Sequence, residues 1–380
     1  MEDSLFSMEA EASPSVRIKF LALGSSACRA LNAFVSDQKM AWEDSLAVDT
    51  DRSALDGLQK ELPKYLFGES LFRGFGAGGD TEWVQKHFSV QDETVQLFCR
   101  RAHVIFLLVG LSGGTGSGML EIVLQIARQA GAFVVVIPLM PFSFEGKHKS
   151  VRAQTQLSYL QTIADLILPF YNDLLFQSLP ETATAQEAFA YGNHLLSQLL
   201  RALYANLSTD NHHTCACHLN DFVRHFAHKP ESLIWSVGSG RGEEAIMQAF
   251  QEALSSPLLQ MKQDRFVPQR ASIWVQAPAE IPLSTWKALN KKLQESFGGS
   301  EVSFLNSGVT RSDGVDEANV LLILIAATKN LKTERFRRKK SKKAAEGREV
   351  LPMQLDFEME NAESYWDTPT YLRLGLKLDP

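Results

Sequence analysis

The chain has 380 residues, of which 45% are hydrophobic and 22% are charged. This composition is that of an ordinary globular protein, so a disordered chain is excluded. The formal net charge of −6 gives no overall signature of nucleic-acid binding, and the length suits two domains of about 150 residues with additional tails.

Cysteine usage and the first residues indicate the compartment. The cysteines Cys28, Cys99, Cys215 and Cys217 are too few and too unevenly placed for a disulfide framework. The first twenty residues are acidic, whereas a secretory signal has a basic start and an apolar run. Since no apolar stretch reaches membrane-spanning length, we expect a cytoplasmic protein without direct membrane insertion.

The first predicted unit is a strand, a loop and a helix. Residues 17–23 are rich in β-formers and run into small residues at 24–27, which open a predicted helix over 28–34. Short apolar runs predict further strands at 46–48, 104–109, 133–139 and 166–170. Helical patterns lie between the later runs, and this alternation predicts a parallel sheet.

A long helix is predicted over residues 186–207, where apolar side chains recur at helical spacing without a proline. A smaller mixed α/β domain is predicted after it. Its strands are expected at 233–237, 272–276, 302–305 and 320–326, and its helices at 243–254 and 284–297.

After residue 328 the composition is that of an unpacked linker. Its basic run at 335–343 is either a solvated segment or a contact to anionic lipid or nucleic acid.

Two glycine-rich loops are the most informative segments. Residues 110–118, Gly-Leu-Ser-Gly-Gly-Thr-Gly-Ser-Gly, follow the strongest predicted strand and precede a predicted helix over 119–129. Glycine permits positive φ and close approach of backbone amides to an anion. A second loop at 74–80, between the second and third predicted strands, is expected at the same end of the sheet. We expect a polyphosphate there, although the first loop can also be only a tight strand-to-helix connection.

Two common nucleotide motifs are absent. No Gly-x-x-x-x-Gly-Lys-Ser/Thr occurs, which excludes a Walker P-loop, and residues 24–26 lack the later glycines of a dinucleotide fingerprint. An α/β oxidoreductase that uses a dinucleotide therefore remains only as a disfavoured alternative.

The sequence at 113–118 resembles the signature loop Gly-Gly-Gly-Thr-Gly-Ser/Thr-Gly of the FtsZ/tubulin family. Further motifs resemble those of the family in the same order: Val-Asp-Thr-Asp at 48–51, Pro-Phe-Ser-Phe-Glu-Gly-Lys at 141–147, Tyr-Asn-Asp-Leu-Leu at 171–175 and Gly-Ser-Gly at 238–240. The likeness covers residues 16–328. Asp-Thr-Pro-Thr-Tyr-Leu-Arg at 367–373 resembles the tail peptide by which bacterial FtsZ docks membrane tethers, which favours the bacterial branch of the family.

The resemblance implies a domain order. A tail at 1–15 precedes a Rossmann-like, parallel-sheet GTP-binding domain at 16–178. A central helix and loop at 183–218 lead to a smaller mixed α/β C-terminal domain at 219–330, a charged linker at 331–365 and a docking peptide at 366–380. The implied function is head-to-tail assembly with copies of itself into filaments at the bacterial division site. GTP, with Mg²⁺ beside its phosphates, fills the interface and leaves GDP after hydrolysis, and no nucleic-acid partner is expected.

The resemblance also assigns nucleotide contacts. The loops that hold the phosphates supply Gly24, Ser25, Ser26, Ala27, Arg29, Asp49, Thr50, Asp51, Gly76, Ala77, Gly78, Gly79, Gly113, Gly114, Thr115, Gly116, Ser117 and Gly118. The ribose contact falls on Glu145 and a further nucleotide contact on Lys149. Asn172, Phe189 and His194 complete the implied site, with Phe189 under the base.

The chain departs from the family at the loop that completes hydrolysis on the neighbouring subunit. The family uses Asn-x-Asp-x-x-Asp, and here Asn220 and Asp221 are followed by Arg224 in place of the second carboxylate. An arginine cannot polarise water as a carboxylate does, so the implied GTPase is weak or altered. A hydrolysis-deficient paralogue that co-assembles with a second, competent FtsZ remains an alternative.

Three other features qualify the implied site. His194 stands where the family has an aspartate that reads guanine, and a neutral imidazole accepts only one hydrogen bond, so guanine selectivity is in question. Arg29 replaces an asparagine and is expected to add charge against phosphate. The His- and Cys-rich segment 212–218 offers zinc ligands, but Cys-x-Cys is tighter than usual zinc spacing and a surface loop is the simpler expectation, so no metal is assigned to these side chains.

Overall fold

The computed structural model describes residues 16–36, 42–208, 222–223, 232–242, 244–259, 266–277, 281–297, 303–311 and 317–328. The chain divides into two compact units, Met1–Leu331 and Lys332–Pro380. The second unit lies outside the described residues, and so do the expected amino-terminal tail, the charged linker and the docking peptide.

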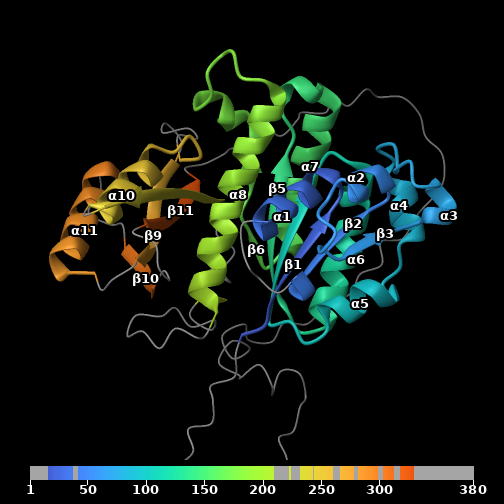
Figure 1. Cartoon of the computed structure of the whole chain (residues 1–380), viewed down its shortest axis with the longest axis horizontal. Coiled ribbons are helices and arrows are strands. Elements are labelled where there is room, and N and C mark those ends of the chain that lie inside the picture. Colours follow the sequence, from blue (N-terminus) through green and yellow to red (C-terminus); the bar gives the residue numbers. More distant parts are fainter. Residues whose placement is uncertain are drawn as a thin grey trace, which may run out of the picture. The chain divides into compact units, whose positions relative to one another are not determined.

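The first sheet is parallel and has seven strands (Figure 1). Its order is β3-β2-β1-β4-β5-β6, and β7 also pairs with β5. The strands are β1 (Ile18–Leu23), β2 (Ser45–Asp49), β3 (Lys64–Leu66), β4 (Val104–Gly110), β5 (Phe133–Met140), β6 (Leu166–Ile167) and β7 (Phe170–Tyr171). The strand order reverses between β1 and β4, which opens a crevice at their carboxyl ends. The predicted parallel α/β sheet is confirmed.

Helices cover both faces of this sheet. They are α1 (Ser25–Ser36), α2 (Arg52–Asp56), α3 (Glu69–Phe72), α4 (Thr81–His87), α5 (Glu93–Cys99), α6 (Gly114–Gln129), α7 (Lys147–Ile163) and α8 (Ala185–Leu207), with short 3₁₀ turns η1 (Trp42–Asp44), η2 (Ser143–Glu145) and η3 (Asn172–Gln177). Alternate residues of β1 face different clusters: Phe20 packs with α1 and α8, whereas Leu21 packs with α6 and α7. Because both faces are buried, the central strands are continuous apolar runs.

Two strands of this sheet differ from the predicted elements. The edge strand β3 was not predicted, because Lys64–Leu66 is only three residues long and carries no apolar run. The predicted strand at 166–170 is two short strands, because the chain between β6 and β7 passes through Pro169, which has no N–H to donate to β5.

The long helix α8 confirms the predicted central helix. It begins with a capping box in which Glu187 N donates to Thr184 Oγ1 (3.2 Å) and Thr184 N donates to Glu187 Oε2 (2.7 Å). Its buried leucines share one core with α1 and with Trp235 of the second sheet, whose Nε1 donates to Pro169 O (3.2 Å). No helix within the described ranges is long and apolar enough to cross a membrane.

The second sheet has four strands in the order β10-β9-β11-β8. They are β8 (Ser232–Arg241), β9 (Phe266–Ala277), β10 (Ser303–Arg311) and β11 (Glu317–Thr328), accompanied by α10 (Ala245–Ser255) and α11 (Leu283–Phe297). β10 is parallel to β9, and β11 is antiparallel to both β9 and β8. This mixed sheet with two helices is the smaller α/β part that the sequence predicts.

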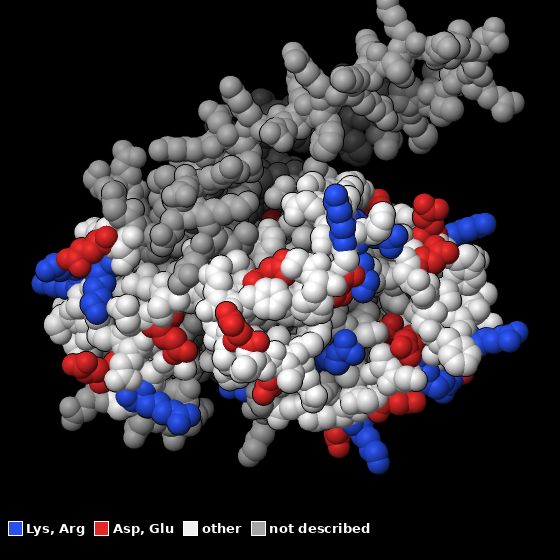
Figure 2. Space-filling model, turned by 90° about the horizontal axis from the view of Figure 1, so that it is seen from above, with Lys and Arg blue, Asp and Glu red and all other residues white. Residues whose placement is uncertain are grey.

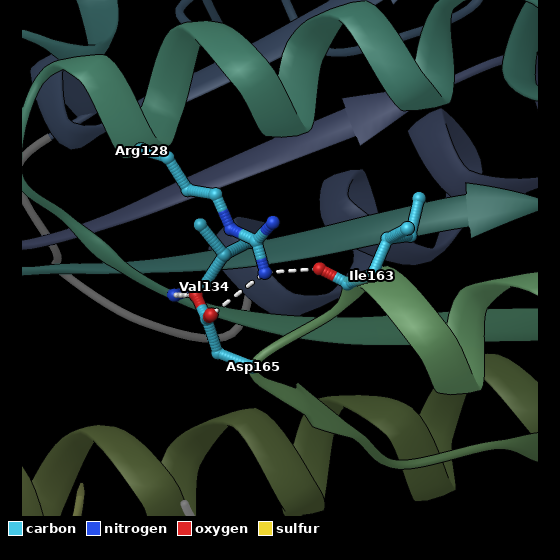
Figure 3. Close-up of polar contacts among 4 residues, drawn as sticks. All are labelled: Arg128, Val134, Ile163 and Asp165. Atoms are coloured by element: carbon cyan, nitrogen blue, oxygen red, sulfur yellow. Dashed lines mark hydrogen bonds and ion pairs between the residues drawn. The ribbon is translucent and has the colours of Figure 1, made fainter. Parts of the chain in front are cut away.

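A polar link fastens the first sheet where α6 ends (Figure 3). Arg128 donates to the carbonyl oxygen of Ile163 and to Asp165 Oδ1 (2.9 Å). Asp165 Oδ2 accepts from Val134 N (3.1 Å) at the start of β5. One carboxylate therefore joins α6, β5 and the connection from α7 to β6.

A histidine beside the start of β1 gives a pH prediction. His103 Nδ1 accepts from Arg17 N (2.9 Å), and partial burial followed by the Arg17 charge lowers the pKa of His103. The native state therefore binds a proton less readily than the unfolded chain. Neutral His103 therefore contributes to the free energy of unfolding at pH values above the unfolded pKa of about 6.5. This contribution is lost as the pH falls through the folded pKa of His103.

We expect His103→Gln, whose amide oxygen still accepts but does not titrate, to lose less stability than the wild type between pH 7 and pH 5. Urea midpoints at the two pH values measure this. Equal losses in the two proteins would contradict the prediction.

Candidate functional site

A polar cleft lies where the loops after β1, β2 and β4 meet the glycine-rich loop that precedes α4. It encloses about 690 Å³, counting the solvent at its open side. Its lining comprises Gly24, Ser25, Ser26, Asp49, Thr50, Asp51, Phe75, Gly76, Ala77, Gly78, Gly79, Gly110, Ser112, Gly113, Gly114, Thr115 and Gly116. The two predicted glycine-rich loops are therefore at the same end of the sheet, as expected.

A smaller and more apolar cavity adjoins the cleft. It encloses about 340 Å³ counted in the same way, but only about 20 Å³ is open to a water-sized molecule. Its lining residues are Ser26, Arg29, Leu139, Phe170, Asn172, Phe189, Gly192, Asn193 and Leu196. Ser26 lines both cavities, so the two are neighbours across a single residue. The pair suits an elongated ligand with one highly polar end and one flat, largely apolar end.

The helix α6 begins inside the signature glycine run. The sequence predicts a loop up to residue 118, but α6 starts at Gly114, and no glycine in 110–118 has positive φ. A Cβ on Gly116 would lie 2.8 Å from both Gly110 O and Leu23 O. These glycines therefore allow the first turn of α6 to pack directly on the ends of β1 and β4, and the free N–H groups of that turn lie at the cleft.

Positive φ belongs instead to the loop 74–80. Gly76, Gly78 and Gly79 have φ values of 79°, 59° and 85°. The loop lies between α3 and α4 and therefore between the second and third predicted strands, although the unpredicted strand β3 precedes it. It rests on α6, because a Cβ on Gly114 would lie 2.9 Å from Ala77 Cβ and 3.0 Å from Asp80 N.

Arg152 also fixes this loop and was not among the predicted residues. Its guanidinium, on α7, donates to Gly79 O (2.8 Å). Arg152 belongs to none of the motifs, so only the packing of α7 beside the loop reveals it. The contact orients the peptide that precedes Asp80, whose side chain accepts from Trp83 N (2.9 Å) at the start of α4.

Asp49 joins three of the loops. Its side chain is 2% exposed and accepts from Ser25 Oγ (2.6 Å), Thr50 N (2.7 Å), Thr115 Oγ1 (3.1 Å) and Asp51 N (3.3 Å). Burial, and then the Asp49 charge, raise the pKa of the Cys28 thiol behind it, so Cys28 is not a nucleophile at neutral pH.

Several predicted phosphate contacts have structural partners. Asp51 caps α2 by accepting from Ser53 N (2.9 Å), although it also lines the cleft. Ser117 donates to Gln156 Oε1 (2.7 Å) on α7, and Gly118 packs against Val84. Ala27, Ser117 and Gly118 line neither cavity.

The predicted ribose contact is engaged in a cap. Glu145 Oε1 accepts from Phe142 N (2.9 Å), and Glu145 Oε2 pairs with Lys149 Nζ (3.2 Å). Neither side chain lines a cavity. A contact to a ribose therefore requires this ion pair to open or to share its oxygens.

The smaller cavity is lined by Asn193 and not by His194. Phe189 and Asn193, four residues apart, share a face of α8 and both line the cavity, whereas His194 is exposed and lines neither cavity. The structure thus places Asn193, and not His194, beside Phe189. Its amide offers one acceptor and two donors for hydrogen bonds. Arg29 also lines this cavity and not the polar cleft, in contrast to its expected place against phosphate.

The remaining predicted residues cannot be placed. Asn220, Asp221 and Arg224 lie outside the described residues, as does the segment 212–218. Within the described ranges no group of three or more His, Cys, Asp or Glu residues is arranged to hold a metal ion. On the face seen in Figure 2, the described basic and acidic side chains are interspersed.

A crevice at the switch point of a parallel sheet, a long helix beside it and a second mixed sheet define the tubulin-like fold. Solved structures agree: an empty FtsZ dimer from M. jannaschii matches with a TM-score of 0.67 and 21% identity over 82% of this chain and 88% of that chain. A GTPγS-bound CetZ2 protofilament from Haloferax volcanii matches with 0.63 and 16% over 84% and 96%. A GTPγS-form TubZ protofilament from Bacillus thuringiensis serovar israelensis matches with 0.58 and 14% over 82% and 85%.

The sequence match is independent of these structures. The family model for the Tubulin/FtsZ family GTPase domain matches residues 17–180, which contain all the described loops of the polar cleft. Residues 17–180 are therefore similar to the GTPase domain of the Tubulin/FtsZ family, and the solved structures show the same fold.

Proposed function

We propose that this chain binds GTP with Mg²⁺ and assembles head to tail with copies of itself into filaments, in bacterial cell division. The observation that carries the proposal is that Ser26 lines both a glycine-lined polar cleft and a neighbouring cavity lined by Phe189. The cleft suits a triphosphate, because amides at the start of α6 and in the loop 74–80 surround it.

The lining of the smaller cavity suits a purine base in its chemistry, and its side chains must move apart to admit one, since only about 20 Å³ is open to a water-sized molecule. Phe189 offers an aromatic surface, and Asn193 and Asn172 offer amide groups for hydrogen bonds. Arg29 adds donors without acceptors, which favours a base edge rich in acceptors, such as the O6 and N7 of guanine. Guanine is therefore the base that we propose, with GDP as the product that remains after hydrolysis.

A divalent cation fits this site chiefly through the phosphates. Asp49 already accepts four hydrogen bonds and Asp51 caps α2, so few protein oxygens remain to coordinate Mg²⁺ directly. When bound, Mg²⁺ neutralises phosphate charge and keeps several water ligands. This chain's own part is to position the phosphates with its loop amides.

Self-assembly is supported by the similar proteins, whose structures are described as a dimer and as protofilaments. We assign the GTP-binding domain to residues 16–178, the central helix and loop to 183–218 and the C-terminal domain to 219–330. Hydrolysis in this proposal is completed across the interface by Asn220 and Asp221 of the next subunit. The peptide 367–373 docks membrane tethers, which places the filament in the cytoplasm at the division site.

A second candidate is a hydrolysis-deficient paralogue that binds nucleotide and co-assembles with a competent FtsZ. Arg224, in place of a carboxylate, is the feature that favours it.

One experiment separates the two candidates. Purified full-length protein is mixed with GTP and Mg²⁺, and light scattering and phosphate release are followed beside Arg224→Asp. We expect the wild type to scatter light with slow phosphate release, and Arg224→Asp to release phosphate about a hundredfold faster or more, the lower end of what one catalytic carboxylate contributes. Scattering only after addition of a competent FtsZ supports the second candidate. No uptake of GTP at millimolar concentration would refute both.

A further inference from the structure

The hydroxyl groups around Asp49 are committed as donors inside the protein. Ser25 donates its only hydroxyl proton to Asp49 Oδ2, and Thr115 donates its own to Asp49 Oδ1. The oxygens of Thr50 and Thr115 are 2.7 Å apart, and since the Thr115 proton is already used, Thr50 must be the donor in that contact. None of these three protons remains for a phosphate oxygen.

Asp49 acts only as a hydrogen-bond acceptor. Two hydroxyl groups and two backbone N–H groups donate to it, and every one of these contacts has Asp49 as the acceptor. Ser25 begins α1 and Thr115 is in the first turn of α6, so the carboxylate lies where two helix amino termini converge. It occupies part of the positive field that a phosphate would otherwise use.

The side-chain charge of the cleft is negative. Among the described residues that line it, Asp49 and Asp51 are carboxylates and none is Lys, Arg or His. Two basic side chains lie near its edges: Arg152 donates to the neutral carbonyl Gly79 O and keeps its charge, whereas Arg52 pairs with Glu69. Arg29 lines the smaller cavity. A bare polyphosphate entering the cleft therefore meets amides but also a fixed negative charge.

We propose that Asp49 is a resident anion of the phosphate site, a positioning residue that holds three loops together while weakening the binding of bare polyphosphate. Its charge makes tight nucleotide binding depend on a divalent cation. The inference rests on the proposed function, because it takes the cleft to be the phosphate site. It reassigns Asp49 from a nucleotide contact to an internal partner of Ser25 and Thr115.

Asp49→Asn separates the charge from the geometry. The Asn oxygen can accept from Thr50 N, Asp51 N and Thr115 Oγ1, as Asp49 Oδ1 does. The Asn amide can donate to Ser25 Oγ, which frees the Ser25 hydroxyl proton for a phosphate. The loops keep their connections, and the site loses one negative charge and gains one donor.

The test is calorimetric titration of the full chain with GTP and with inorganic tripolyphosphate, each in EDTA and in excess Mg²⁺. We expect Asp49→Asn to bind both ligands about tenfold more tightly than the wild type in EDTA, the effect of roughly one charge contact. The gain should shrink in Mg²⁺, because the cation already offsets the charge.

Asp92→Asn is the matched control, since it removes the same charge at a residue that caps α5 through Val95 N (3.0 Å) and lines neither cavity. Its affinities should stay within about twofold of the wild type, because screening weakens charges at this distance. Unchanged or weaker binding by Asp49→Asn in EDTA would overturn the inference, and so would loss of its folded state in thermal unfolding.

The two proposals fail in different ways. A wild type that binds tripolyphosphate but no GTP in Mg²⁺ would refute the proposed function, while the difference between Asp49→Asn and the wild type with tripolyphosphate still decides the inference.

Discussion

Gly116→Ala is expected to unfold or severely destabilise the first sheet and to abolish GTP binding. The added Cβ would lie 2.8 Å from Gly110 O and from Leu23 O, at the ends of β4 and β1. Both atoms belong to the backbone, and Leu23 pairs with Val109 in the sheet, so relief requires α6 to move away from the strands. We expect a loss of about 3 kcal/mol or more in the free energy of unfolding, at or beyond the upper end for overpacking.

Gly113→Ala is the matched control for stability. Gly113 has φ of −88°, and an added Cβ would meet nothing within 4 Å. Its free energy of unfolding should change by less than about 1 kcal/mol, since alanine adopts this conformation without strain. Urea unfolding measures both variants, and calorimetry measures GTP binding by Gly116→Ala. Similar losses in the two variants would show that close packing does not explain the glycine at position 116.

Gly238→Ala is expected to be as damaging, but in the second sheet. A Cβ on Gly238 of β8 would lie 2.1 Å from Ala249 O and 2.5 Å from Ala253 N, both backbone atoms of α10. The helix must then leave the strand and expose Ala249 and Ala253, which are fully buried. We expect a loss of about 3 kcal/mol or more in unfolding free energy. Assembly measured by light scattering should fall more than GTP affinity, because Gly238 lines neither cavity.

Gly242→Ala distinguishes a clash from backbone strain. Gly242 has φ of 83°, and an added Cβ would meet nothing within 4 Å. Only conformational strain of about 1–2 kcal/mol is expected. If Gly242→Ala were as destabilising as Gly238→Ala, the contact between β8 and α10 would not be the cause.

The central strands and long helices could be predicted because their burial produces apolar patterns in the local sequence. β4 and β5 are covered on both faces and are therefore continuous apolar runs, and α8 carries its apolar residues at helical spacing. β3 could not be predicted, because a three-residue edge strand has little apolar pattern. The start of α6 at Gly114 could not be predicted, because glycine has a low helix propensity. Packing of the helix against β1 and β4 overrides this propensity.

The candidate site was predicted as loops but not as individual contacts. Parallel strands bring their carboxyl ends to one edge, so the meeting of residues 24–26, 49–51, 76–79 and 113–116 followed from their order along the chain. The place of Asn193 beside Phe189 depends on which face of α8 turns inward. The engagement of Glu145 by Phe142 N and Lys149 depends on a local turn that the motif does not specify.

By itself, the sequence determined the family resemblance, the alternation of strands and helices and the end of the sheet where the glycine-rich loops meet, since these follow from local patterns and chain order. Only the tertiary structure decided which side chains are left for a ligand. Hydrogen bonds between segments far apart in the chain occupy donors and acceptors that a ligand would otherwise use. The bonds that Ser25 and Thr115 donate to Asp49 are an example. No local pattern records such partners.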